Sequence, residues 1–242
     1  MAFESMKNIM FSQSIMSTST EQKEALGTLR VLSDGRKFRY CKNGAAAIEP
    51  GLLVMPVAES ANHKDEDMPA DASAGDSTIK ITLGATAVEK DEYAGGFLSI
   101  YNATDDEDRG QQYEILSHPA HAGGGDLELT LVTPLVRDVP EDDTKLSLIR
   151  NRYKDVVVTT GDEVPVTGVT VCNVAAGAYF WAQSGGVATV VAGTADPQIG
   201  QMAKCSDNGD AEVMAGVTAS FIGVAQSTIA TGAAGPILLM LD

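Results

Sequence analysis

Two histidines at short spacing are the first residues in this chain that could do chemistry. His118 and His121 enclose a Pro-Ala dipeptide and could supply two imidazole ligands to a zinc ion. A closed zinc site needs four ligands, and no further ligands cluster nearby in the sequence. The glycine run 123–125 follows at once and is typical of a loop. We therefore expect His118, His121 and the remaining His63 to be loop residues that bind no metal.

Carboxylates gather in the run Asp105-Asp106-Glu107-Asp108, and carboxylate oxygens are the ligands that calcium prefers. The run lacks the alternating ligands and the central glycine of an EF-hand loop. An exposed acidic turn is the favoured interpretation, with bound calcium left open.

Motifs for catalysis are missing from the sequence. There is no Gly-x-Ser-x-Gly elbow, and the glycines at 95–96 and 123–125 lack the lysine and the strand-to-helix context of a phosphate loop. Acidic residues are abundant, but nothing selects a pair for glycoside cleavage. Three widely spaced cysteines predict buried free thiols. We predict that the chain is not an enzyme and uses no cofactor.

The composition limits the partners. The 242 residues carry 33 acidic and 17 basic side chains, a formal net charge of -16, which repels nucleic acid and anionic lipid. No stretch approaches the roughly 20 apolar residues of a membrane helix. The N-terminus also lacks the pattern of a secretory signal. We expect no nucleic-acid or membrane partner and synthesis in a cytoplasm.

Short segments with strand character recur along the chain, separated by Gly, Asp and Asn. An Asp-Gly turn joins 28–32 to 37–41 and predicts a β-hairpin. Pro56 predicts an edge or bulged strand over 51–57. Further strands are expected at 78–83, 97–101, 112–116, 127–131, 146–149, 156–159, 168–171, 178–182, 187–191, 221–225 and 236–241. Helical patterns are scarce, so we predict an all-β fold of multi-stranded sandwich or barrel modules.

Residues 1–24 differ from the rest, because apolar side chains lie among Ser, Thr and Gln with no regular period. This pattern predicts an extended N-terminal arm that packs on a neighbouring subunit, although a frayed terminus is an equal alternative. Deletion of residues 1–20 should then leave a folded core and greatly weaken assembly. The predicted domains are the arm 1–24, a discontinuous β domain of 25–60 with 152–242, and an inserted β module at 75–150, preceded by a connecting loop at 62–76.

The aromatic triplet Tyr179-Phe180-Trp181 could form a sugar-binding platform. In a strand, however, Tyr179 and Trp181 share one face while Phe180 lies on the other. Core packing is the favoured interpretation.

Several short motifs resemble a family of virion structural proteins of tailed bacteriophages, of the head decoration or capsid cement type. They include Leu26-Gly27-Thr28-Leu29-Arg30, Asp34-Gly35-Arg36-Lys37-Phe38-Arg39-Tyr40, Asn151-Arg152-Tyr153-Lys154-Asp155-Val156-Val157 and Tyr179-Phe180-Trp181-Ala182-Gln183-Ser184-Gly185-Gly186. The resemblance implies a β-rich protein on the capsid exterior that reinforces the shell. It also implies two partners, the major capsid protein and further copies of the chain in a homotrimer or another symmetric oligomer.

The residues expected at the assembly interface come from the arm and from the hairpin turn. They are Phe3, Ile9, Phe11 and Ile15, together with Asp34 and Arg36. Two other functions stay open: a tail-fibre or receptor-binding module that recognises host glycans, and a calcium-dependent adhesion or carbohydrate-active domain.

Overall fold

The computed structural model describes residues 11–102, 110–141, 144–216 and 219–242, and it is all-β, as predicted. Sixteen strands are present, and every ladder between them is antiparallel. One turn of 3-10 helix, η1 (Ala61–His63), is the only helix in these ranges. Across the same residues, no helix has the length and apolar character needed to cross a membrane.

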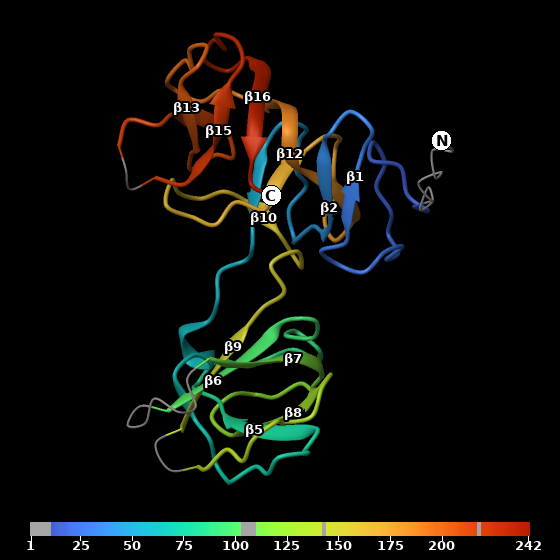
Figure 1. Cartoon of the computed structure of the whole chain (residues 1–242), viewed down its shortest axis with the longest axis vertical. Coiled ribbons are helices and arrows are strands. Elements are labelled where there is room, and N and C mark those ends of the chain that lie inside the picture. The colour runs from blue at the N-terminus through green and yellow to red at the C-terminus, as the bar shows by residue number, and fades with distance from the viewer. Residues whose placement is uncertain (1–10, 103–109, 142–143, 217–218) are drawn as a thin grey trace, which may run out of the picture. The chain divides into compact units, whose positions relative to one another are not determined.

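The chain divides into two compact units, each with its own sheet (Figure 1). Unit 1 comprises residues 1–57 and 152–242, and unit 2 comprises residues 58–151. The predicted ranges placed 58–60 with the main domain and treated 62–76 as a connecting loop. In the structure, 62–76 belongs to unit 2, where Ala72 forms an isolated bridge with Val139.

Unit 1 contains ten strands in the order β10-β3-β11-β12-β16-β15-β13-β14, with β2 pairing β12 and β1 pairing β2. Their bounds are β1 (Leu29–Val31), β2 (Lys37–Lys42), β3 (Leu53–Met55), β10 (Val157–Val158), β11 (Gly168–Thr170), β12 (Tyr179–Val191), β13 (Met202–Cys205), β14 (Ala211–Val213), β15 (Phe221–Ala225) and β16 (Ala234–Met240). The predicted hairpin is confirmed as β1 and β2, and Gly35 in its turn has φ of 86°.

Strand β12 organises unit 1, because it pairs with β2 along its first half and with β16 along its second half. The sequence predicted two strands here, with a break at Gln183–Gly186. The structure instead has one 13-residue strand with a register shift between Gln183 and Gly185, followed by Gly186 with φ of 78°. Such a bulge bends a strand without ending it.

Strand β3 corrects another expectation. Pro56 predicted an edge or bulged strand, but β3 lies between β10 and β11 in the sheet and pairs with both without a register shift. The strand ends at Met55, so the proline lies outside the ladder and removes no donor from it.

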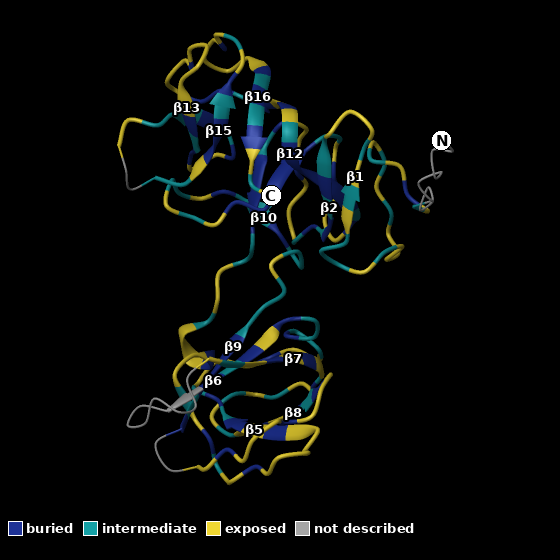
Figure 2. Ribbon diagram, in the orientation of Figure 1, coloured by how far each residue is buried: buried dark blue, intermediate teal, exposed yellow. Residues whose placement is uncertain are grey.

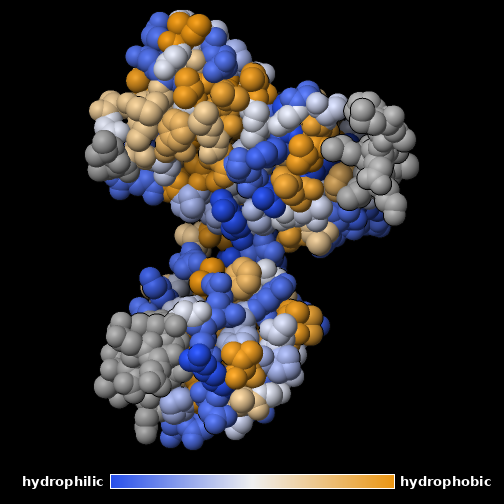
Figure 3. Space-filling view, in the orientation of Figure 1, coloured by the Kyte–Doolittle hydropathy of each residue, from blue (hydrophilic) through white to orange (hydrophobic). Residues whose placement is uncertain are grey.

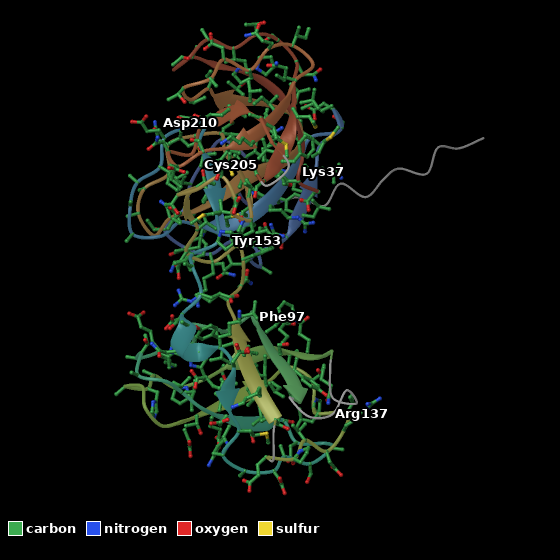
Figure 4. The ribbon with its side chains drawn as sticks, turned by 90° about the vertical axis from the view of Figure 1, so that its left-hand side faces the viewer. Lys37, Phe97, Arg137, Tyr153, Cys205 and Asp210 are labelled. Carbon is green, nitrogen blue, oxygen red and sulfur yellow. The ribbon has the colours of Figure 1, made fainter. Side chains whose placement is uncertain are left out.

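Unit 1 buries three apolar clusters around the sheet (Figure 2). The largest packs the inner residues of β12, β16, β15 and β13, and it includes Cys205, whose place inside the unit Figure 4 shows. A second cluster contains Phe180 and Cys41, and a third contains Trp181, Tyr40 and Phe38. Trp181 and Phe180 are therefore in clusters on opposite faces, and the predicted core packing of Trp181 is confirmed.

Unit 2 is a six-stranded sheet in the order β4-β9-β6-β7-β8-β5, around one apolar core. Its strands are β4 (Glu66–Asp67), β5 (Thr78–Thr82), β6 (Phe97–Asn102), β7 (Gln111–Ser117), β8 (Asp126–Leu131) and β9 (Thr144–Ile149). In β5 and β8 the buried and exposed residues alternate, which is why the period-two pattern located these strands from the sequence.

The charge is divided very unevenly between the units. The sequence of unit 2 contains 20 acidic and 7 basic residues, a net charge of -13 out of the -16 of the whole chain. Unit 1 contains the other 13 acidic and 10 basic residues, a net charge of -3. The acidic character that the composition assigned to the whole protein is thus mainly a property of unit 2.

Candidate assembly surface

The arm residues that the structure describes are packed on unit 1 of their own chain. The ring of Phe11 contacts Trp181 edge to face, with ring centroids 5.1 Å apart, and Ile15 packs on the same aromatic cluster. Ser19 also pairs with Tyr179 through two backbone hydrogen bonds of 3.0 and 2.8 Å. The predicted contact of Phe11 and Ile15 with another subunit stays a prediction, while Phe3 and Ile9 lie outside the described residues.

Gln13 binds this segment to the sheet, a role that no sequence pattern indicated. Its side chain is 5% exposed; Oε1 accepts a hydrogen bond from the Tyr40 hydroxyl at 2.8 Å, and Nε2 donates to the carbonyls of Ser17 (2.8 Å) and Tyr179 (3.0 Å). Its own carbonyl accepts from Trp181 Nε1 at 3.2 Å and from an Arg30 guanidinium nitrogen at 2.8 Å. Residues 11–20 are therefore an integral layer of unit 1 and are not frayed.

The two predicted turn residues, Asp34 and Arg36, are joined by hydrogen bonds and an ion pair. Asp34 accepts hydrogen bonds from the backbone N–H of Arg36 (3.0 Å) and from Arg36 Nε (2.8 Å), and these bonds lower the pKa of the Asp34 carboxyl. Both side chains are partly exposed. The pair defines the hairpin turn, and Arg36 continues over the ring of Phe38, 5.8 Å from its centroid.

Arg36 also lines a groove of about 400 Å³ that begins beside the hairpin turn. Met16 and Val171 lie on its wall, and Val187 of β12 extends it onto the sheet. Met16 is exposed, so the apolar lining is open to solvent. The groove therefore connects the predicted turn residue Arg36 with the outer face of the unit 1 sheet.

That outer face carries a continuous row of apolar side chains, one from each of four neighbouring strands. Val187 of β12 pairs with Leu238 of β16, Leu238 pairs with Val224 of β15, and Val224 pairs with Met202 of β13. Directly paired residues in an antiparallel sheet point to the same face. We call Val187, Leu238, Val224 and Met202 the apolar row.

The apolar row is accessible. Val187 is 49% exposed and Met202 is 54% exposed, while Leu238 and Val224 are half-buried. Met240, the next outward residue of β16, is 53% exposed. In Figure 3, apolar residues gather over β13, β15 and β16 of this unit. Clustered apolar side chains on a folded surface mark interaction sites more often than scattered ones do.

The apolar row departs from the usual pattern of an antiparallel sheet with one wet face, in which the outward residues are polar. In β16 the inward residues Ile237 and Leu239 are buried in the core, yet the outward residues Leu238 and Met240 are apolar as well. A strand that is apolar on both faces is typical of a sheet covered on both sides. The unbroken run 236–241 was the available sequence signal, although it predicted only a strand.

The lysine at the border of the apolar row forms ion pairs within its own unit. Lys204 of β13 lies between Asp162, with Nζ to Oδ2 at 2.9 Å, and Glu212, with Nζ to Oε2 at 3.4 Å. The hydrogen bond that Lys204 donates to Asp162 contributes most to the raised pKa of Lys204, and the same bond lowers the pKa of Asp162. The apolar row itself contains no charged side chain, so its chemistry is that of an apolar contact surface.

The histidine prediction needs correction in unit 2. His63 and His118 are 1% and 2% exposed, and both lie against Tyr93 rather than in open loops. The Tyr93 hydroxyl is 2.7 Å from His63 Nδ1, while the Tyr93 backbone N–H donates to His118 Nε2 at 3.0 Å. His118 Nδ1 faces the carbonyl of Pro119 at 2.8 Å, so both nitrogens of this ring already have protein partners.

Metal chemistry gains no support from the described part of the chain. Among those residues, no group of three or more His, Cys, Asp or Glu side chains could hold a metal ion. The acidic run Asp105–Asp108 lies outside the described residues. All three cysteines are free; Cys41 and Cys205 are buried as predicted, and Cys172 is half-buried.

No family model, curated protein sequence or solved structure matches the chain.

Proposed function

We propose that the chain is a structural protein that works by assembly, and that its role is to decorate and reinforce the outside of a tailed-phage head. The apolar row on unit 1 carries this proposal, because an assembly protein needs a surface whose burial stabilises a complex. The resemblance of several short motifs to virion structural proteins supports the proposed location. In this role the major capsid protein and further copies of the chain are its partners.

The separation of charge supports the same role. Unit 1 has a net charge of -3 and carries the apolar row, whereas unit 2 has a net charge of -13. Unit 1 itself therefore contributes little electrostatic repulsion to a contact made through its own surface. A strongly acidic unit also suits a protein on the outer surface of a capsid, which has no packaged DNA to bind.

The proposal is tested by cosedimentation of the purified protein with expanded, undecorated phage heads. Saturable binding at a stoichiometry that matches the capsid symmetry, with heads that resist heat or osmotic shock better, is the expected result. Recovery with tail fractions or host cells instead of heads would contradict head decoration and favour the tail-fibre or receptor-binding alternative. A glycan array gives that alternative its own readout.

A further inference from the structure

We infer that Asn208 is a site of spontaneous covalent modification, at which the side-chain amide is lost and aspartate or isoaspartate is formed. The chain contains two asparagines that are followed by glycine, Asn43 and Asn208. Both lie in unit 1, and the chemistry does not depend on the proposed function. The structure places the two asparagines in opposite environments, so that only Asn208 is free to react.

The reaction needs only the asparagine, the glycine that follows it and water. The backbone nitrogen of the glycine attacks the side-chain carbonyl carbon (Cγ) of the asparagine. The amide leaves as ammonia, taking up the proton of the glycine N–H, and a succinimide ring is formed. Water then opens the ring at either of its carbonyls, which gives aspartate or isoaspartate. Glycine favours the attack because it has no Cβ that would obstruct its nitrogen.

Asn43 is protected at the atoms that would react. Its side chain is 1% exposed, and Nδ2 donates hydrogen bonds to the carbonyls of Ala46 at 2.7 Å and Ala175 at 2.9 Å. The N–H of Gly44, which would have to attack, donates to the carbonyl of Val156 at 2.9 Å. Ring closure would break these bonds inside the protein, where a lost hydrogen bond is not replaced by water.

Asn208 has no comparable protection. It lies in the turn between β13 and β14, and its side chain is exposed; Asp210, two residues further along, marks this turn in Figure 4. Among the described residues no hydrogen bond reaches the Asn208 side chain, while its backbone N–H donates to Ser206 Oγ at 3.2 Å. The side chain also lines a polar pocket of about 370 Å³ together with Asp162 and Lys204. Water therefore has access to the amide.

The modification would change both the charge and the backbone of this turn. Either product adds a carboxylate to the pocket that contains Lys204, where it competes with the existing acidic partners of that lysine. In isoaspartate the main chain also runs through the former side-chain carbon, directly before Gly209. The carbonyl of Gly209 accepts a hydrogen bond from the Leu53 N–H at 2.6 Å. We expect isoaspartate to weaken this bond between the turn and β3.

The test is incubation of the folded full chain at mildly alkaline pH, with peptide mapping by mass spectrometry over several weeks. Conversion of amide to acid should be more than about 10-fold faster at Asn208 than at Asn43, because the buried site reacts only when it opens locally. A methyltransferase specific for isoaspartate identifies that product. In the isolated isoaspartate form, hydrogen exchange at the Leu53 amide should be faster than in the unmodified chain.

Two controls separate the chemistry from the fold. Asn208→Gln keeps an exposed amide but would have to close a larger ring, so position 208 should stay unconverted. Incubation in urea removes the protection of Asn43, and the two rates should then converge. Circular dichroism checks that the chain stays folded during the incubation without urea.

Conversion at Asn208 that is no faster than at Asn43 in the folded chain would overturn the inference, because the turn would then protect its amide as well as the core does. A rate difference that persists unchanged in urea would overturn it too, since neighbouring residues rather than the fold would then decide the rate. Unchanged exchange at Leu53 would contradict the expected effect on β3.

Discussion

Replacement of Gln13 by alanine tests whether residues 11–20 are an integral layer of unit 1. The wild-type side chain makes three hydrogen bonds, of 2.8, 2.8 and 3.0 Å, to Tyr40, Ser17 and Tyr179. A buried hydrogen bond contributes about 1 kcal/mol net, so their loss costs about 3 kcal/mol. Release of the ordered glutamine side chain returns up to roughly 1–2 kcal/mol of conformational entropy, while the vacated volume adds a packing cost. We expect a loss of about 2–3 kcal/mol in the free energy of unfolding of unit 1.

Trp181 makes the measurement specific, because it is the single tryptophan of the chain and its indole N–H donates to the Gln13 carbonyl. Denaturant unfolding followed by tryptophan fluorescence therefore reports unit 1 and the segment docked on it. The matched control is Gln22→Ala, which removes an exposed side chain with one hydrogen bond to the Glu24 carbonyl. The control should change stability by less than about 0.5 kcal/mol. Equal stability of the two variants would refute the docking of residues 11–20.

Two truncations extend this reasoning to the arm. The structure changes the expectation that residues 1–20 are dispensable for folding, because their deletion removes Gln13 and uncovers the aromatic cluster around Trp181. Deletion of residues 1–20 should cost at least as much stability as Gln13→Ala. Deletion of residues 1–10 removes none of these contacts and should leave the fluorescence transition unchanged. A loss of stability in the shorter truncation would show that residues 1–10 also support the fold.

Three further predictions concern single residues of unit 1. Gly223→Ala should lower the free energy of unfolding by about 2–3 kcal/mol, because the added Cβ would lie against the backbone carbonyl of Leu238 in β16. The control Gly216→Ala has open space around its Cβ and should leave the free energy of unfolding nearly unchanged in the same denaturant titration. Hydrogen bonds from Arg39 lower the pKa of the Asp242 carboxyl. The carboxylate therefore stabilises unit 1 above its unfolded pKa of about 4, and this stabilisation is lost as the pH falls through the pKa of the folded state. In Asp242→Asn, the free energy of unfolding measured from pH 7 to 2 should fall less steeply at acid pH than in the wild type. Burial raises the pKa of the Cys41 thiol, so a thiol reagent should label it only after denaturation, as mass spectrometry can establish.

The strands that the sequence located are those with local signals. The Asp-Gly turn placed the hairpin, and period-two patterns placed five of the six strands of unit 2, while β4 falls in the expected connecting loop. Strands β13 and β14 were missed because their sequences, Met-Ala-Lys-Cys and Ala-Glu-Val, consist mostly of residues with low strand propensity. β12 was divided in two because its Ser-Gly-Gly sequence is typical of a turn, while pairing with β2 and β16 holds the strand together through it.

The candidate sites escaped prediction for a different reason, since they depend on pairs that are distant in the sequence. Gln13 and Tyr179 are 166 residues apart, and no local pattern links them. The apolar row joins residues of four strands whose register is set by the whole sheet. The composition showed enough apolar residues for a core, but only the pairing revealed that some of them face outward.

The uneven charge of the chain also affects the expectation that it binds no nucleic acid. Most of the negative charge lies in unit 2, so the net charge of the chain does not rule out a basic patch on unit 1. The segment 30–42 has five basic residues and one acidic residue, a composition that could mark a phosphate-binding surface. In the structure all five basic side chains bond to atoms of their own unit: Arg30 to the Gln13 carbonyl, Arg36 to Asp34, Lys37 and Arg39 to Asp242, and Lys42 to Asp155. A phosphate would have to displace these partners, which weakens its binding. For unit 1, the expectation of no nucleic-acid partner therefore rests on these hydrogen bonds and ion pairs rather than on net charge.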